Sequence, residues 1–241
     1  PANTWPADGA TGVSVTPTLQ WTAVDGAGSY DIQLSEDSGF NTAVRDIAGF
    51  IGTSGYVAVP LDELQTYYWH VRAVSCNGVV SNWSDSRDFT TGTAINFPDP
   101  GLKAAVRVAA SVWGDDIYQS DLDGLTYLDS QDMNISDLTG LEHCTNLSTL
   151  YLSNNLVSNI SALSSLYSLQ QLSLNNNQVG NISMLSGLAD LRNLFIDGNN
   201  ISDISPLASL TNLQWLDAQE NQIADISSLS GLTNLQQLYL G

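Results

Sequence analysis

Few residues of this chain have the types and spacing that catalysis needs. Its two histidines, His70 and His143, stand far apart, and no HExxH, CxxC, GxSxG or Gly-rich phosphate loop occurs. The run 121–124, Asp-Leu-Asp-Gly, begins like a calcium loop but lacks its remaining ligands. We therefore expect no enzyme activity and no cofactor or metal, with calcium as the weak alternative. His70 is expected on a solvated strand face and His143 in a structural role.

The sequence instead indicates a binding function. Aromatic and acidic side chains recur in register through the second half of the chain. Large aromatic side chains dominate many binding energies, and carboxylates tune the electrostatics of an interface. The candidate binding residues are Tyr127, Asp129, Tyr151, Phe195, Asp197, Trp215, Asp217, Glu220 and Tyr239.

The element that must position these residues is a leucine-rich repeat of 22 residues. The pattern Leu-x-x-Leu-x-Leu predicts a short strand whose fourth and sixth side chains point inward. The third, fifth and seventh positions point outward and build what we call the concave face. The sequence leaves open whether the rings on this face bind a partner or only stack on one another. Successive steps begin at Leu125, Leu147, Leu169, Leu191, Leu213 and Leu235.

Two further positions of the repeat predict how its turns are held. Asparagine at position nine is expected to form a ladder of hydrogen bonds with the backbone of neighbouring turns. Serine or threonine at position fifteen is expected to be the N-cap of a short helical turn on the convex side, with Pro206 in the first turn of one of them. Acidic residues of the convex turns are expected to cap locally. The ladder residues are Asn155, Asn177, Asn199 and Asn221; the hydroxyl residues are Thr139, Ser161, Ser183, Ser205 and Ser227; the acidic residues include Asp137, Asp203 and Asp225.

The segment LSTLYLSNNLVSNISALSSLYS resembles the internalin-type leucine-rich repeats of bacterial surface proteins. The preceding FPDPGLKAAVRVAASVW predicts an amphipathic helix opened by Pro100, with Leu102, Val106 and Ala109 on one face. In that family such a segment caps the N-terminal edge of the solenoid. The resemblance spans about 96–241 and implies binding of host or neighbouring proteins through the concave face.

The first part of the chain has short, Val-, Tyr- and Trp-rich segments separated by turn residues, which predicts an antiparallel β-sandwich. LQW, YDIQLS, LDELQTYYWHVRA and NWS resemble a fibronectin type III domain, which implies Trp21 as its core tryptophan and Tyr67 as its tyrosine corner. An immunoglobulin-like sandwich of another type is the alternative. The candidate strands are 18–24, 30–35, 43–47, 55–60, 67–75 and 87–91.

The predicted fold is therefore multidomain. A sandwich over 1–92 is followed by a linker and helical cap over 93–124. A solenoid of the α/β class with short convex 3-10 turns then spans 125–241, which holds five full repeats and the start of a sixth. The last strand is expected to be an open edge that another molecule or further chain covers, which allows self-association.

The amino-acid composition restricts the classes of partner that the chain can bind. Six basic and 25 acidic residues give a formal net charge of −19, which excludes nucleic acid on electrostatic grounds. No apolar run is long enough to span a membrane. Cys76 and Cys144 form no disulfide framework, and Cys144 stands at a leucine position of the repeat, where a small buried hydrophobe is expected.

These features predict a non-enzymatic extracellular or cell-surface binding module that mediates adhesion or protein–protein interaction. Carbohydrate is a second candidate ligand, because aromatic and amide side chains share the concave face. A structural subunit of a surface layer or filament is one alternative function. Accessory binding modules of a larger secreted enzyme are another.

Overall fold

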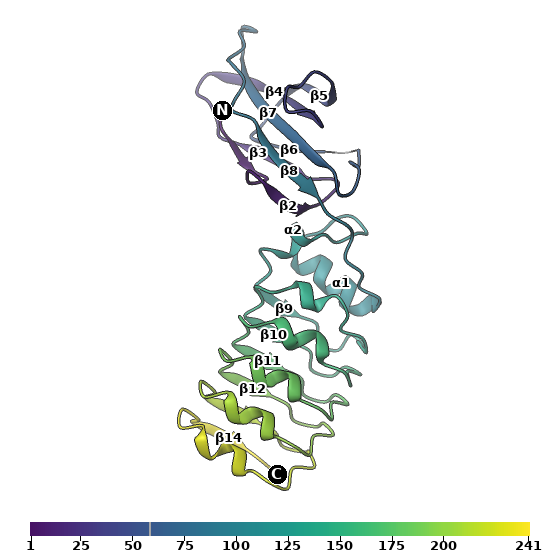
Figure 1. The fold of residues 1–241 in the computed structure, drawn as a ribbon, viewed down its shortest axis with the longest axis vertical. Helices are drawn as coiled ribbons and strands as arrows, with labels where there is room; N and C mark the ends of the chain where they lie inside the picture. The colour runs from purple at the N-terminus through teal and green to yellow at the C-terminus, as the bar shows by residue number, and fades with distance from the viewer. Residues whose placement is uncertain (58) are drawn as a thin grey trace. The chain divides into compact units, whose positions relative to one another are not determined.

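The computed structural model describes residues 1–57 and 59–241, which form two compact units. The first unit is Pro1–Ala94 with Tyr118–Ser120, and the second is Ile95–Ile117 with Asp121–Gly241. Figure 1 labels most of their helices and strands. Among the described residues, no helix is both long and apolar enough to cross a membrane.

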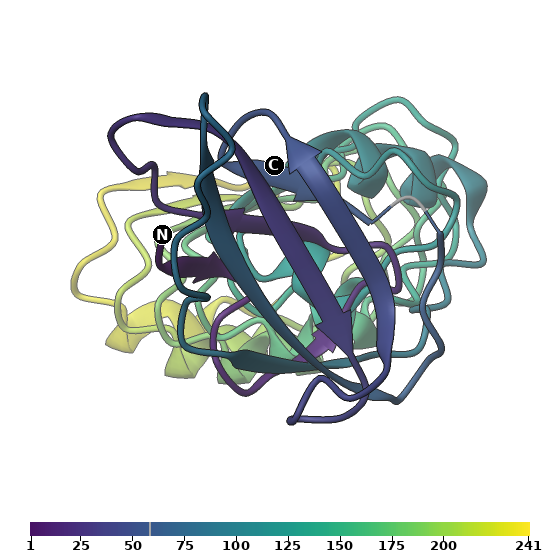
Figure 2. The ribbon, with the colours of Figure 1, turned by 90° about the horizontal axis from the view of Figure 1, so that it is seen from above.

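The first unit is a sandwich of two sheets, drawn in purple to blue in Figures 1 and 2. In the described part of the chain, the larger sheet has the order β2-β8-β7-β4-β5 and the smaller one the order β1-β3-β6. Its strands are β1 (Asn3–Trp5), β2 (Ala10–Val13), β3 (Thr18–Trp21), β4 (Ala27–Ser35), β5 (Ala43–Phe50), β6 (Ser54–Tyr56), β7 (Thr66–Ser75) and β8 (Arg87–Thr91).

Six of these strands lie where the sequence predicts them, and β1 and β2 were not predicted. Both unpredicted strands are short, and both pair at the edge of a sheet, so that neither carries a long alternating pattern. Strand β6 covers only the start of the predicted segment 55–60, and Ala58 within that segment lies outside the described residues.

Alternate residues of β7 contribute large side chains to the sandwich core. Tyr67, Trp69 and Val71 are all buried at 1% exposure or less, and Trp21 packs in the same core. The hydroxyl of Tyr67 accepts a hydrogen bond from the backbone N–H of Asp62 at 3.0 Å. This is the bond of a tyrosine corner, which ties the connection before β7 to the strand.

His70 is not solvated, contrary to the expectation from the sequence. Its ring lies between those of Phe40 and Trp83, with centroid distances of 3.7 and 4.1 Å, and its Nε2 is 2.9 Å from Oε1 of Gln33. Burial, followed by the charge of Arg72, lowers the pKa of His70 to about 4. Alternation places His70 on the outer side of the sheet, but aromatic side chains from two loops cover it there.

The second unit stacks successive turns of chain so that one strand of each turn joins a parallel sheet. Figure 2 looks along this stack and shows the green to yellow turns progressively offset. Residues at equal repeat positions are register partners, as in Leu150↔Leu172 and Leu172↔Leu194. The strands are β9 (Tyr127–Asp129), β10 (Thr149–Tyr151), β11 (Gln171–Ser173), β12 (Asn193–Phe195), β13 (Trp215–Asp217) and β14 (Gln237–Tyr239).

The interior of the stack is a ladder of aliphatic side chains, as the 22-residue pattern predicts. Leu128, Leu150, Leu172, Leu194 and Leu216 are completely buried at the fourth position. Cys144 takes a leucine position and is also completely buried, which confirms its expected role, and both cysteines are free thiols.

The predicted asparagine ladder is present. The side-chain oxygen of Asn177 accepts from the backbone N–H of Val157 in the previous turn, at 3.0 Å. Its amide nitrogen donates to the carbonyl oxygens of Leu152, Leu174 and Asn175 at 2.9 to 3.2 Å. One side chain therefore satisfies four backbone groups where water is excluded.

Each repeat crosses the convex side as a 3-10 helix, but the residues that cap these helices differ from the prediction. The hydroxyl residue at position fifteen is the first helical residue in four of the turns and makes no capping hydrogen bond through its side chain. The residue two positions earlier caps instead: Oδ1 of Asp203 accepts from the backbone N–H of Ser205 at 2.8 Å. Local capping by acidic residues of the convex turns is thereby confirmed. The helices are η1 (Leu141–His143), η2 (Ser161–Ser165), η3 (Ser183–Gly187), η4 (Ser205–Ser209) and η5 (Ser227–Gly231).

Helix α1 (Pro100–Ala109) packs on the first turn of the stack as the predicted cap, and the short helix α2 (Gln119–Leu122) precedes β9. Pro100 opens α1, and Leu102 and Val106 are completely buried. The prediction for the third core residue is wrong: Ala109 is exposed, and Ala105 is buried instead. Ala109 is the last residue of the helix and stays accessible in an open hollow between the helix and β9.

Candidate binding face of the repeat domain

The parallel register of β9–β14 sorts the outward residues into rows. Because equal repeat positions are paired from strand to strand, each row runs straight across the sheet. One row is Tyr127, Thr149, Gln171, Asn193, Trp215 and Gln237. The other is Asp129, Tyr151, Ser173, Phe195, Asp217 and Tyr239.

Three of the predicted aromatic residues meet across β12, β13 and β14. The Trp215 ring lies between those of Phe195 and Tyr239, with centroid distances of 6.0 and 5.8 Å. All three side chains are partly exposed. We call Phe195, Trp215 and Tyr239 the aromatic trio. Because the residues beneath β12 and β13 are completely buried leucine and isoleucine side chains, these two strands hold their rings on a rigid support.

The two other predicted aromatic residues form a separate pair. The rings of Tyr127 and Tyr151 meet edge to face at 5.8 Å. Gln171 donates from Nε2 to the Tyr151 hydroxyl at 2.6 Å, and the hydroxyls of Ser153 and Ser173 lie 2.6 Å apart. The sequence did not single out Gln171 or Ser173. These polar residues are on strand β11, which lies between the tyrosine pair and the aromatic trio.

Three of the four predicted acidic residues lie beside the aromatic trio. Desolvation, followed by the charges of Asp217 and Glu220, raises the pKa of Asp197. The charges of Asp217 and Glu220 therefore act on Asp197, although only Asp217 of the three lies on a strand. The outward positions of the strands carry no lysine or arginine. The face is therefore electrostatically suited to a cationic partner.

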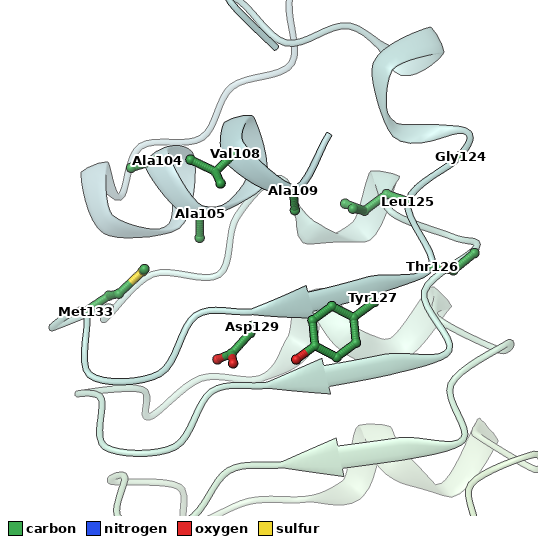
Figure 3. A pocket seen from close by; sticks show the side chains of 10 residues that line it. All are labelled: Ala104, Ala105, Val108, Ala109, Gly124, Leu125, Thr126, Tyr127, Asp129 and Met133. Carbon is green, nitrogen blue, oxygen red and sulfur yellow. The ribbon is translucent and has the colours of Figure 1, made fainter. Parts of the chain in front are cut away.

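Asp129 lies apart from these acids, next to Tyr127. Desolvation, followed by the charge of Asp129, raises the pKa of Tyr127. The same two residues line an apolar groove between α1 and β9, together with Val108 and Met133 (Figure 3). The sequence did not predict this groove. The sequence feature that could have indicated the groove is a second apolar face of α1. On this face Ala104 and Val108 are exposed beside Ala109.

The described residues offer no set of side chains that could hold a metal ion. Over residues 1–57 and 59–241, no group of three or more His, Cys, Asp or Glu side chains is placed to hold an ion. His143 is exposed on η1, and His70 is enclosed in the sandwich unit.

Both halves of the chain match known families. A family described as Leucine Rich repeats (2 copies) matches residues 167–209 and 211–241. A family described as Rha78A-like, N-terminal immunoglobulin domain matches residues 9–94. The second match favours the immunoglobulin-like alternative that the sequence left open beside fibronectin type III.

Relatives of the repeat half include internalins. Internalin H of Listeria monocytogenes is 39% identical over 77 residues, which are 30% of this chain and 14% of that protein. The crystal structure of an internalin, InlF, from the same organism has a TM-score of 0.50 at 28% identity, covering 58% of this chain and 48% of that one. Internalin C2 of Listeria monocytogenes has a TM-score of 0.37 at 29% identity, covering 60% and 94%.

The matched part of this chain spans 14% of Internalin H and about half of the InlF structure. The pattern of the repeats, the helical cap, Internalin H and the InlF structure agree on one assignment. The chain carries an internalin-type leucine-rich repeat domain preceded by an immunoglobulin-like domain.

Proposed function

We propose that this chain is a non-enzymatic binding module of a cell-surface or secreted protein, and that its concave face recognises a partner protein in adhesion. The observation that carries the proposal is the aromatic trio on the sheet of β12–β14. Exposed aromatic rings on a rigid surface lose little conformational entropy on binding and bury a large area. The internalin relatives support the same proposal, because they share the repeat type.

The charged residues beside the aromatic trio predict the charge of the partner surface. Desolvation and then the charges of Asp217 and Glu220 raise the pKa of Asp197, so that the three carboxylates repel one another. A lysine or arginine of the partner relieves this repulsion and stacks on an aromatic ring at the same time. The partner surface is therefore expected to be basic where it meets β12 and β13.

The thiols provide a way to immobilise the chain without blocking this face. Cys76 is exposed in the first unit, whereas Cys144 is buried, and desolvation raises its pKa to about 12. A biotin maleimide at neutral pH therefore attaches to Cys76 and leaves the repeat domain unmodified.

The experiment screens the biotinylated chain against arrays of extracellular proteins and of glycans. Bound proteins are then measured against Phe195→Ala and Asp217→Lys variants. Tyr167→Ala is the matched control, because this tyrosine is 64% exposed and lies outside the parallel strands. We expect Phe195→Ala to weaken binding about tenfold or more and Tyr167→Ala to have no effect.

Equal binding by wild type and both concave-face variants would contradict the proposal. Binding to glycans alone would replace the protein partner with a carbohydrate. Light scattering of the same chain tests the structural alternative, since a filament or surface-layer subunit assembles with concentration and a monomeric adhesin does not. Thermal melts of each variant confirm that the fold is intact before binding is compared.

A further inference from the structure

A half-open apolar groove of about 530 Å³ lies between helix α1 and strand β9 (Figure 3). We call it the cap groove. The helix contributes Ala104, Val108 and Ala109, whose small side chains leave room above the strand. Tyr127 forms the wall on the side of the strand, and Met133 lines the groove from the turn that follows β9.

The apolar side chains of this groove are poorly covered. Val108 is 81% exposed, Tyr127 is 51% exposed and Met133 is 40% exposed. They come from three different segments and face one hollow, which distinguishes them from single exposed hydrophobic residues. Met133 is also a flexible side chain that adapts to the shape of an occupant. The groove is therefore suited to one large apolar side chain.

The charge of the groove predicts which residue of the ligand lies next to that apolar side chain. Asp129 is the one charged residue among the lining residues. Its Oδ1 accepts hydrogen bonds from the backbone and side-chain nitrogens of Gln131 at 3.3 and 3.0 Å, and it makes no ion pair within the described residues. Residues 95–241 contain fifteen acidic and three basic residues. Two of the three basic residues, Lys103 and Arg107, lie on α1 but do not line the groove, so that Asp129 sets the charge inside it and attracts a cation.

We propose that the cap groove binds an aromatic or large aliphatic side chain of a partner polypeptide, next to a lysine or arginine that pairs with Asp129. The groove continues into the concave face, because Tyr127 and Asp129 belong to both. The inference rests on the proposed function for the existence of a polypeptide partner. It adds a second contact, separate from the aromatic trio, and names its chemistry.

The chain has a built-in probe of this groove and a built-in control. It contains two methionines, Met133 in the groove and Met184 in η3, packed against the core of the stack. Methionine labelled with ¹³C at the methyl group therefore gives two NMR signals from the full chain. The ligands are blocked tetrapeptides: Gly-Phe-Lys-Gly as the probe, with Gly-Phe-Glu-Gly and Gly-Gly-Lys-Gly as matched controls.

We expect Gly-Phe-Lys-Gly to shift the Met133 signal with a Kd of about 1–10 mM, as befits a single anchored side chain. The Met184 signal stays in place, and neither control peptide saturates the Met133 shift. Val108→Arg fills the groove with its own cation and abolishes the shift. Trp113→Arg, the same charge at a side chain that is 95% exposed and outside the groove, leaves it unchanged. Asp129→Asn weakens binding about two- to fivefold, the size of an exposed ion pair.

Three results would each overturn the inference. The first is no shift of Met133 with Gly-Phe-Lys-Gly at about ten times the expected Kd. The second is an equal shift with Gly-Phe-Glu-Gly, which removes the cation. The third is an undiminished shift in Val108→Arg, which places binding elsewhere. The variants that test the aromatic trio do not alter this readout, so that either proposal can fail while the other stands.

Discussion

The carboxylate of Asp99 caps helix α1 and also accepts a hydrogen bond from the backbone N–H of Ser136 in the first repeat, at 2.9 Å from Oδ2. Its Oδ1 accepts from Gly101 and Leu102 at the start of the helix. One side chain therefore fastens the cap to the stack. This double role explains why a helix of ten residues holds its position at the end of the solenoid.

Replacing Asp99 is expected to loosen the cap. Asp99→Ala leaves donors of the helix and of the first repeat unsatisfied and should lower the free energy of unfolding by about 2 kcal/mol. Asp99→Asn keeps one acceptor oxygen and should lose about half as much. Urea unfolding measures both, with Asp225→Ala as the control, because Asp225 caps an exposed convex turn. Equal losses for Asp99→Ala and Asp225→Ala would show that the contact to Ser136 adds nothing.

The same residue predicts a loss of stability in acid. Desolvation opposes ionisation of Asp99, but the backbone N–H groups of Ser136, Leu102, Asp137 and Gly101 outweigh it and hold its pKa below the usual 3.8. A carboxyl with a lowered pKa in the folded state stabilises fully above its unfolded pKa. Its contribution is lost as the pH falls through the folded value. The difference in stability between wild type and Asp99→Asn should therefore shrink below about pH 4.

Asn177→Ala should be among the most damaging single changes in the repeat domain. It removes the partner of one backbone N–H and three carbonyl oxygens inside the stack. The expected loss is about 3 kcal/mol. Asn181→Ala is the matched control, because that exposed amide accepts one hydrogen bond from Ser183 and should cost about 0.5–1 kcal/mol. Equal urea midpoints for the two variants would contradict the role of the ladder.

The enclosed ring of His70 predicts pH-dependent stability of the immunoglobulin-like domain. Its pKa falls from 6.5 to about 4 on folding, because burial and then the charge of Arg72 oppose protonation. The unfolded chain therefore binds more protons between these two values. Stability should be fully present above pH 6.5, decline as the pH falls toward about 4 and level off below it.

Substitution and NMR test this prediction together. His70→Phe retains a ring between Phe40 and Trp83 but cannot titrate, and it should flatten the pH dependence of unfolding in that window. The imidazole Cε1–H signal of His70 should titrate with a midpoint of about 4. A midpoint near 6.5 would mean that the ring is solvated, as its place on the outer side of β7 first predicted.

The repeat domain was predictable in detail because its contacts are periodic. Each buried leucine, such as Leu172, repeats a contact made one turn earlier, so that a single pattern of spacing defines strand, interior and ladder together. The hydroxyl at position fifteen misled the prediction. Serine is a common N-cap residue, which is why Ser205 was predicted to cap. Asp203, two residues earlier, caps instead, because its side chain accepts a hydrogen bond from the backbone N–H of Ser205 directly.

The sandwich was less predictable, because its contacts join segments that are distant in sequence. His70 alternates with buried residues, and no local pattern shows that Phe40 and Trp83 cover it. The cap groove was missed for the same reason, since Val108 and Met133 line one groove only when α1 docks on the first turn.

By itself, the sequence determined the period, the parallel register and the side of each strand residue, because 22-residue spacing and strand alternation are local properties of the chain. It therefore placed Phe195, Trp215 and Tyr239 on one face. Only the tertiary structure decided that these rings meet, that Tyr127 and Tyr151 form a separate pair, and that Gln171 lies between them. Those relations depend on the diagonal contacts between neighbouring strands, which packing sets and spacing alone does not.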